Sequence, residues 1–389
     1  MTIPQKIINT VERIAQDIAR PNADDVDINA RFPIESLNAL KEVNILSAGV
    51  PQSLGGYGLD IIELGELCRI IAKHCASSSM VLGMHFIKVA SIVHFGKGID
   101  NVDSYLKLLV KEQRLVGSVT SEEGIGGNLR NSIAYIQPNE NENGFSLTKH
   151  STCLSYGAYA DDLLITCRRD EDSARSNQVV VLATRDDFTL EQHGEWDSMG
   201  MRGTCSPPFT VTVNAKMWQI FEPDFAHIAA RTMVPETHYI WSNIWLGIAC
   251  DSAIRARNLI QSKARKNPSV LPDGAKELAQ LEIELERFRD TVKSVGKRYM
   301  KAHLEDDIDY LSSIGFSLKI NALKLNSSQL VTDICLKAMT ICGFAGYLNN
   351  TPFSIARNLR DALSAAPMIG NGRLIETNAT NLLVYKNDD

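Results

Sequence analysis

Apolar residues recur at every third or fourth position through most of the first 111 residues, which is the spacing of one buried helix face. The pattern is clearest at Ser36–Val43, Ile61–Lys73 and Val102–Val110. Glycines and a proline interrupt it at Val50–Asp60 and predict a turn between helices. We therefore predict a helical first domain over residues 1–113.

The next stretch changes to short β-type runs separated by Gly, Asn, Asp and Pro, which is typical of strands and turns. Val179–Ala183 and Phe209–Val213 are examples, and the polar patch Asn139–Asn143 is predicted to be a hairpin loop. Helical spacing returns after residue 222, with an apolar face formed by Leu278, Leu281, Leu285 and Phe288. The pattern predicts an α+β fold with a middle β-domain at 114–222 and a helical domain at 223–389.

Composition narrows the class of protein. The chain has 389 residues, of which 44% are hydrophobic, and can bury more than one core. Its formal net charge of −6 leaves no basic stripe, so nucleic acid is not expected as a partner. No uninterrupted apolar run approaches the roughly 18 residues of a membrane span. No leader with a cleavage site is recognisable, so we expect a cytoplasmic protein that does not cross a membrane.

The sequence offers no strong metal site. Its eight cysteines are scattered and form no CxxC pair, so reduced thiols in apolar surroundings are expected. The acidic run Glu305–Asp309 would point its side chains to different faces of a helix, which favours a solvated surface.

Five short segments together carry a resemblance to a known family. The most specific is Glu195–Ser206, which contains Met-Gly-Met-Arg-Gly-Thr-Cys-Ser. The others are the glycine-rich loop Ser121–Asn128, the turn Val50–Asp60, the strand Cys153–Asp161, and Gly343–Tyr347 followed by Arg360 and Asp361. Taken in their order along the chain, and with helices before and after the β-domain, these segments resemble the acyl-CoA dehydrogenase superfamily over nearly the whole chain.

The resemblance implies an N-terminal helical domain, a middle β-barrel or β-sandwich and a C-terminal four-helix bundle. It also implies FAD between the β-domain and the C-terminal helices, and a homodimer or homotetramer in which adjacent subunits complete the site. The residues that it assigns to FAD are Val119, Ser121, Gly126, Gly127, Cys153, Ser155, Arg265, Thr340, Gly343 and Asn371.

Two of the segments that contain these residues depart from the family pattern. Cys153 replaces the tryptophan that walls the flavin, whereas Ser155 keeps the hydroxyl. The family's Arg-x-x-Phe-Gly becomes Arg265–Ser269, without the phenylalanine and the glycine.

The larger departure concerns the catalytic base. Ordinary members use a glutamate to remove the α-proton of the thioester, and Ile369 aligns with that glutamate. A minority draws its base from the first helix of the C-terminal domain, at a place that corresponds to Thr237, with Glu236 one residue away. Glu236 is therefore a candidate base, and an exposed acid at a helix start beside Pro235 is the competing interpretation.

The tail from Arg360 onwards resembles natural-product enzymes that form aminomalonyl and hydroxymalonyl extender units on acyl carrier proteins. The resemblance implies oxidation of a carrier-bound aldehyde to a carboxylate, with Asn371 and Arg373 as candidates to hold an anionic product. Three alternatives stay open at this point: acyl-CoA α,β-desaturation with Glu236 as base, a flavin monooxygenase of the same fold, and a flavin-free scaffold.

Overall fold

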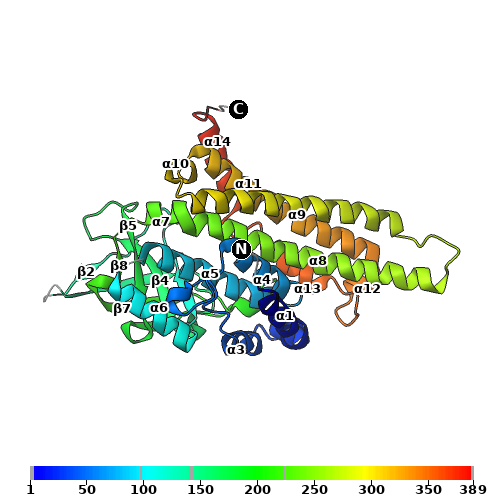
Figure 1. The fold of residues 1–389 in the computed structure, drawn as a ribbon, viewed down its shortest axis with the longest axis horizontal. Coiled ribbons are helices and arrows are strands. Elements are labelled where there is room, and N and C mark those ends of the chain that lie inside the picture. Colours follow the sequence, from blue (N-terminus) through cyan, green and yellow to red (C-terminus); the bar gives the residue numbers. More distant parts are fainter. Residues whose placement is uncertain (1–3, 97–98, 140–142, 223, 387–389) are drawn as a thin grey trace.

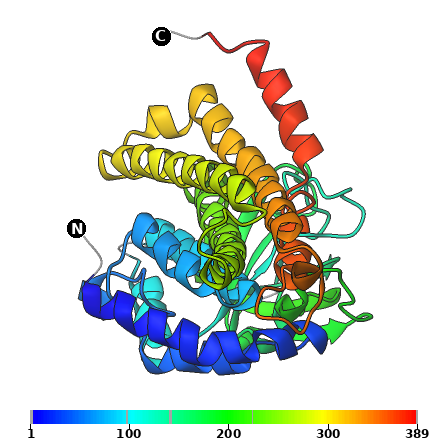
Figure 2. The same ribbon diagram turned by 90° about the vertical axis from the view of Figure 1, so that its right-hand side faces the viewer.

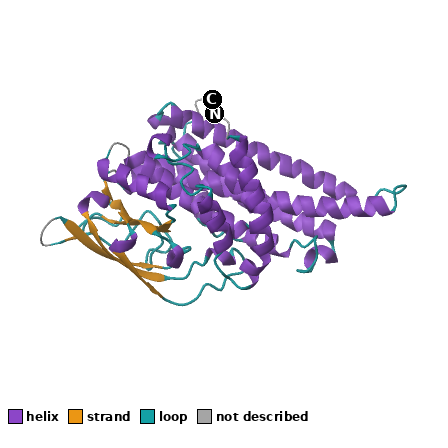
Figure 3. Ribbon diagram, turned by 60° about the horizontal axis from the view of Figure 1, so that its bottom comes forward, coloured by secondary structure: helices purple, strands orange, loops and turns teal. Residues whose placement is uncertain are grey.

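The computed structural model describes residues 4–96, 99–139, 143–222 and 224–386. Helices occupy both ends of the chain and strands the middle, so the predicted α+β class is confirmed. The strands gather at one end of an elongated molecule, and the long helices extend away from them (Figures 1 and 3). The predicted boundaries near 113 and 222 stay predictions, and the secondary structure changes type close to both.

Helices make up the first part of the chain. In chain order the helices are α1 (Gln5–Ile14), α2 (Arg20–Ile28), α3 (Ile34–Glu42), α4 (Ile61–Ala72), α5 (Ala76–Gly96) and α6 (Asp100–Glu112). The expected turn precedes α4, which begins with a capping box between Asp60 and Glu63. Within the turn, a Cβ at Gly56 would lie 2.1 Å from the Val50 carbonyl oxygen, so only glycine fits there.

Helix α5 has the length and composition of a membrane-spanning helix, but 83% of its most apolar stretch is buried inside the protein. Core helices of soluble proteins can have the same length and apolar composition. Serine, histidine and lysine interrupt its apolar residues, which is why no long uninterrupted run marks it in the sequence.

Two four-stranded sheets form the middle part. The first has the order β1-β4-β5-β8 and the second β2-β3-β7-β6. The strands of the first are β1 (Val116–Val119), β4 (Asp162–Arg168), β5 (Gln178–Ala183) and β8 (Ile220–Phe221). Those of the second are β2 (Gln137–Pro138), β3 (Gly144–Ser151), β7 (Phe209–Lys216) and β6 (Phe188–Gln192). The expected loop at 139–143 falls mostly outside the described residues, between the paired strands β2 and β3.

Three long helices dominate the last part of the chain, and they lie side by side in Figures 1 and 2. They are α8 (Val234–Lys266), α9 (Ala275–Leu304) and α11 (Ile314–Cys342), and the shorter α13 (Ala356–Leu363) packs on α8 and α11. The remaining helices are α7 (Phe225–Ile228), α10 (Ile308–Leu311), α12 (Phe344–Tyr347) and α14 (Asn371–Leu382). Helix α14 projects from the body (Figure 2).

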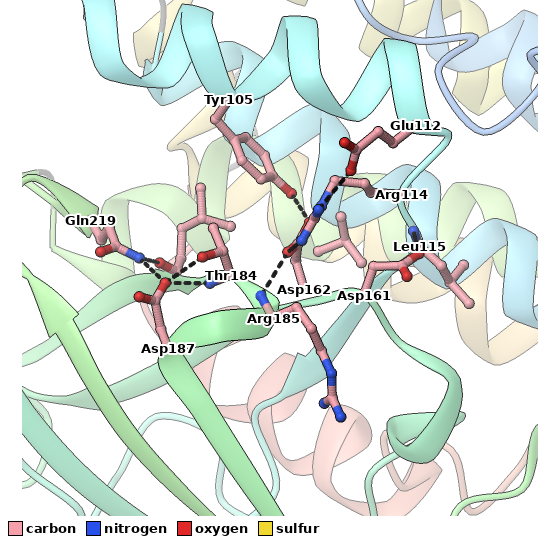
Figure 4. A network of polar contacts seen from close by, with 12 residues as sticks. Tyr105, Glu112, Arg114, Leu115, Asp161, Asp162, Thr184, Arg185, Asp187 and Gln219 are labelled. Atoms are coloured by element: carbon pink, nitrogen blue, oxygen red, sulfur yellow. Dashed lines mark hydrogen bonds and ion pairs between the residues drawn. The ribbon is translucent and has the colours of Figure 1, made fainter.

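A buried ionic network joins the first helical part to the first sheet (Figure 4). The Asp162 carboxylate at the start of β4 is fully buried and accepts from Arg114 Nε at 2.7 Å and Arg114 Nη2 at 2.6 Å. It also accepts from the Tyr105 hydroxyl at 2.8 Å and the Arg185 backbone N–H at 3.2 Å. A buried charge with this many partners is compensated, so the network fixes α6 against the sheet.

The cysteines and the acidic run follow the predictions. All eight cysteines are free, six are buried, and Cys153 and Cys205 are half-buried. The residues Glu305–Asp309 are exposed, and Asp307 caps α10 by accepting from the Tyr310 N–H.

Candidate active site

The loop that follows β1 is fixed to the segment beginning at Cys153. Ser121 Oγ donates to the Cys153 carbonyl oxygen at 2.8 Å and accepts from the Cys153 N–H at 3.1 Å. Val119 ends the buried strand β1 two residues earlier, and Ser155 lies two residues after Cys153. The structure thus brings together Val119, Ser121, Cys153 and Ser155, which the resemblance assigns to flavin binding.

The first of the two acidic residues in this loop has a structural role. Glu122 is buried and accepts from Ser132 Oγ and the Ala134 N–H, both at 2.6 Å, and lies 3.5 Å from Lys149 Nζ. Burial raises the pKa of Glu122, but the Lys149 ammonium and these hydrogen bonds outweigh it, so the pKa is lowered overall. An ionised Glu122 therefore holds the start of the loop against the segment at Ser132 and Ala134.

The loop presents its backbone at Gly126 and Gly127, which have φ of +58° and +71°. A Cβ at Gly126 would meet nothing within 4 Å, so the backbone there borders open space. The guanidinium of Arg373, at the start of α14, donates to the carbonyl oxygens of both glycines, at 2.8 Å to Gly126. Arg373 therefore joins the C-terminal helices to this loop.

The most specific motif contacts the Arg360-Asp361 pair. A Cβ at Gly200 would lie 2.1 Å from the Arg360 carbonyl oxygen, which explains the glycine between two methionines. Asp361 Oδ1 accepts from the Met201 N–H at 2.6 Å, and burial raises the pKa of Asp361 to about 6. The Arg-Asp pair therefore holds the Met-Gly-Met-Arg segment against α13.

The same segment continues into a chain of hydroxyls that ends at a predicted flavin ligand. Thr204 Oγ1 lies 2.8 Å from Ser206 Oγ, which donates to Ser155 Oγ at 2.9 Å. Because each hydroxyl can rotate its proton, the chain can present either a donor or an acceptor at Ser155.

A buried lysine stands beside the position of the missing base. Lys324 on α11 is fully buried and donates to the Ile369 carbonyl oxygen at 3.0 Å and to Asn371 Oδ1 at 2.6 Å. Asn371 Nδ2 donates in turn to Ser328 Oγ at 3.0 Å. Burial lowers the pKa of Lys324 to about 8. Sequence reasoning did not identify Lys324, although a lysine between apolar helix residues was a visible signal.

Glu236 is not the exposed acid of the competing interpretation, because it is buried at 4% exposure. Its position in the first turn of α8 suggested exposure, but neighbouring helices cover that turn. Its Oε1 accepts from the Tyr299 hydroxyl at 3.2 Å, and Oε2 has no partner among the described residues. Burial raises the pKa of Glu236 to about 8. Thr237, at the position of the alternative family base, donates to the Met233 carbonyl oxygen.

Two tryptophans lie further along α8, with ring centroids 6.0 Å apart. The indole N–H groups of Trp241 and Trp245 are buried and have no acceptor among the described residues. The Lys324 ammonium lies 5.9 Å from the Trp245 ring centroid, within reach of a cation–π interaction.

Three predicted flavin ligands do not reach this place. Arg265 is exposed near the end of α8, Thr340 near the end of α11, and Gly343 just after α11. These helix ends lie at the opposite end of the molecule from the sheets (Figure 1).

The residues present fit a flavin. The open backbone at Gly126, the Ser155 hydroxyl and Cys153 come from the middle part of the chain, and the open positions Gly370 and Gly372 flank Asn371 in the C-terminal part. Backbone groups and hydroxyls of this kind can hydrogen-bond the polar edge of a flavin ring.

Comparisons with known proteins give a consistent family. Residues 4–99 match the model of the acyl-CoA dehydrogenase N-terminal domain, and residues 244–375 match that of the C-terminal domain. The chain is 20% identical over 374 residues to the probable acyl-CoA dehydrogenase YngJ of Bacillus subtilis, with 92% of each chain covered. The match to YdbM of the same organism spans half of each chain, at 21% identity. The probable FMNH2-dependent monooxygenase SfnC of Pseudomonas putida is 21% identical, with 86% of this chain and 87% of that protein covered.

Solved structures share the whole fold. FMN-bound TdsC of Paenibacillus sp. A11-2, a dibenzothiophene monooxygenase, superposes with a TM-score of 0.84 at 18% identity, covering 98% of both chains. Butyryl-CoA dehydrogenase of Megasphaera elsdenii superposes with a TM-score of 0.78 at 17% identity, covering 98% of this chain and 100% of that one.

Proposed function

Because the chain belongs to the acyl-CoA dehydrogenase family, we propose that it is a FAD-dependent oxidoreductase that oxidises an aldehyde on an acyl thioester to a carboxylate. The thioester is carried by an acyl carrier protein, and the reaction serves extender-unit formation in polyketide or nonribosomal peptide biosynthesis. A bound flavin supplies the hydride acceptor. The proposal is supported by Ile369, which the sequence resemblance aligns with the catalytic glutamate of the family.

The chemistry explains why the base is dispensable. A hydrated aldehyde, RCH(OH)2, would lose a hydride from its carbon to the flavin and a proton from one hydroxyl to solvent water, which gives the carboxylic acid. No α-C–H bond is broken, so no carboxylate beside the flavin is needed. Neither known base position provides one here, since they hold Ile369 and Thr237.

A second candidate function is a flavin monooxygenase of the same fold. It is favoured by the likeness to TdsC and SfnC, whose names describe monooxygenases. A monooxygenase of this kind would need reduced flavin from a separate reductase. Turnover that requires both the reductase and oxygen would identify this function.

The proposed function is tested by anaerobic titration of the flavin-loaded protein with two pantetheine thioesters. We expect the 3-oxopropanoyl thioester, which carries an aldehyde, to bleach the flavin band, and the butyryl thioester to leave it unchanged. Bleaching by butyryl alone would contradict the proposal and indicate desaturation. Glu236→Gln would then test the base, since a desaturase using Glu236 would lose the bleaching while keeping its flavin.

The proposed enzyme is a cytoplasmic homodimer or homotetramer. Arg265, Thr340 and Gly343 lie far from the loop at Gly126 within one chain, so they would complete the flavin site of an adjacent subunit. We expect Arg265→Ala to weaken FAD retention in the oligomer, which ultrafiltration of the coloured protein measures. Unchanged retention would contradict this assignment.

A further inference from the structure

Lys88 is a charged residue in the interior of the core helix α5. Its side chain is buried, at 6% exposure, yet it forms no hydrogen bond and no ion pair within 4.0 Å with any described residue. The one ionisable group that bears on its pKa is Glu236, on α8. An ammonium on a mostly buried side chain lowers stability when it has no close partner, so its presence calls for a functional reason.

One oxygen of Glu236 also lacks a hydrogen-bond partner. The Tyr299 hydroxyl satisfies Oε1, whereas Oε2 is buried without a partner among the described residues. Tyr299 comes from α9, and its single hydroxyl proton is shared between Glu236 Oε1 and the Arg231 carbonyl oxygen, which lies 3.1 Å from the hydroxyl. The open side of the carboxyl group is thus Oε2.

The register of the two helices places Lys88 and Glu236 on one interface. Ser91 Oγ lies 3.0 Å from Thr232 Oγ1, and each of these residues is about one helical turn from Lys88 or Glu236. Towards its other end, α5 contacts the Met-Gly-Met-Arg segment, where a Cβ at Gly203 would lie 2.9 Å from Ser77 Cβ. Helix α5 therefore connects this pair to the proposed active site, and Thr237 follows Glu236 directly.

The charge of the pair at neutral pH favours an anion. Burial lowers the pKa of Lys88 to about 8 and raises the pKa of Glu236 to about 8. At pH 7 the lysine is therefore mainly protonated and the carboxyl group mainly neutral, which gives a net positive pair. The Tyr299 hydroxyl, whose pKa burial raises well above its ordinary value, contacts Glu236. The Arg231 guanidinium is paired with Asp306, so these two side chains together add no net charge.

We infer that Lys88 and Glu236 form a binding site for a carboxylate of the substrate or product, and that the enzyme handles malonyl-type thioesters. The inference rests on the proposed function, whose product carries a carboxylate besides the thioester. The ammonium donates charged hydrogen bonds to the carboxylate, and the protonated Glu236 donates its O–H. Both buried groups then gain the partners that they lack.

The anion-binding residues predicted from the sequence are less suited to this role. The Arg373 guanidinium already donates to the carbonyl oxygens of Gly126 and Gly127. Asn371 is held by Lys324 and Ser328. Arg373 and Asn371 hold the loop at Gly126 and the start of α14 in place, whereas Lys88 is free to bind a ligand.

The test is isothermal titration calorimetry of the flavin-loaded protein with malonyl-CoA and butyryl-CoA, which differ in the terminal group of a short acyl chain. At pH 7 we expect malonyl-CoA to bind about tenfold more tightly or better, the value of a charged hydrogen bond. At pH 9 we expect the preference to disappear, because Lys88 has lost its proton and Glu236 has become an anion. Equal binding at pH 7 would overturn the inference.

Three variants show which residue causes the preference. Lys88→Met should abolish the preference for malonyl-CoA, while Lys111→Met, an exposed lysine on α6, should keep it. Glu236→Gln should keep the preference at pH 7 and extend it towards pH 9, because the carboxylate that repels the ligand is gone. A full preference in Lys88→Met would overturn the inference, and the pH series on the unaltered protein tests it even if that variant does not fold.

The two proposals fail separately. If malonyl-CoA binds preferentially but the 3-oxopropanoyl thioester does not bleach the flavin, the carboxylate site stands and the aldehyde oxidation falls. If the aldehyde bleaches the flavin and malonyl-CoA shows no preference, the oxidation stands and the Lys88 site falls.

Discussion

Two regions of this molecule bury charge, and they do so in opposite ways. At the junction of α6 and β4, Asp162 accepts hydrogen bonds from Arg114, Tyr105 and a backbone N–H. At the interface of α5 and α8, Lys88 has no close partner among the described residues and Glu236 leaves one oxygen unpaired. The first arrangement holds two parts of the fold together, and the second lacks what a ligand would supply. Completeness of pairing therefore separates a structural charge cluster from a candidate binding site.

The largest expected effect comes from breaking the complete cluster. Arg114→Met would leave the Asp162 carboxylate buried without its main partner. We expect the free energy of unfolding to fall by about 3–5 kcal/mol, as for other buried pairs that lose one member. Urea denaturation measures it, with the exposed Lys111→Met as the control. A loss below about 1 kcal/mol would show that the junction is not held by this pair.

Unfolding as a function of pH probes the incomplete cluster. Because the folded pKa of Glu236 is raised, its contribution to stability is present below about pH 4.5 and is lost as the pH rises through about 8. Glu236→Gln should remove this decline, a change of more than about 1 kcal/mol between pH 5 and 8. Parallel pH profiles of the variant and the unaltered protein would contradict the raised pKa.

Lys88→Met should change the free energy of unfolding in the opposite direction to Arg114→Met, or hardly change it. Replacing a buried, poorly paired charge by an apolar side chain is often neutral or stabilising. We expect the free energy of unfolding at pH 7 to stay within about 1 kcal/mol of the unaltered value or to rise. Urea denaturation beside Arg114→Met provides the comparison, and a loss as large as that of Arg114→Met would mean that Lys88 is structural.

The smallest expected effect is at Arg373, whose guanidinium is exposed but joins α14 to the loop at Gly126. Arg373→Ala should change the free energy of unfolding by less than about 0.5 kcal/mol. Retention of flavin should fall slightly, because the loop loses its link to the C-terminal helices. Flavin titration followed by fluorescence measures this, with Arg298→Ala on α9 as the control.

Much of the fold could be predicted from the sequence, because helical spacing and strand runs are local signals. The motifs also carried positional information: Met201 and Asp361 lie 160 positions apart in the chain and are hydrogen-bonded in the structure. Ser121 and Cys153, which the resemblance assigns to flavin binding, are hydrogen-bonded to each other, and their role in flavin binding stays a prediction.

What the sequence could not provide is the environment of single charges. Glu236 follows a proline in a helix start, a local context that suggests exposure, and only the packing of α5 and α9 buries it. Lys88 and Lys324 stand among apolar residues, but whether such a lysine reaches solvent depends on helices far away in the chain. Burial and pairing are tertiary properties, and the candidate site depends on both.

The most direct test of the central claim is a deuterium isotope effect on flavin reduction. A 3-oxopropanoyl thioester deuterated at the aldehyde carbon should bleach the flavin more slowly than the unlabelled compound in anaerobic stopped flow, because hydride leaves from that carbon. Equal rates for the two compounds, together with slower bleaching by a butyryl thioester deuterated at its α-carbon, would contradict the account and establish α-proton abstraction instead.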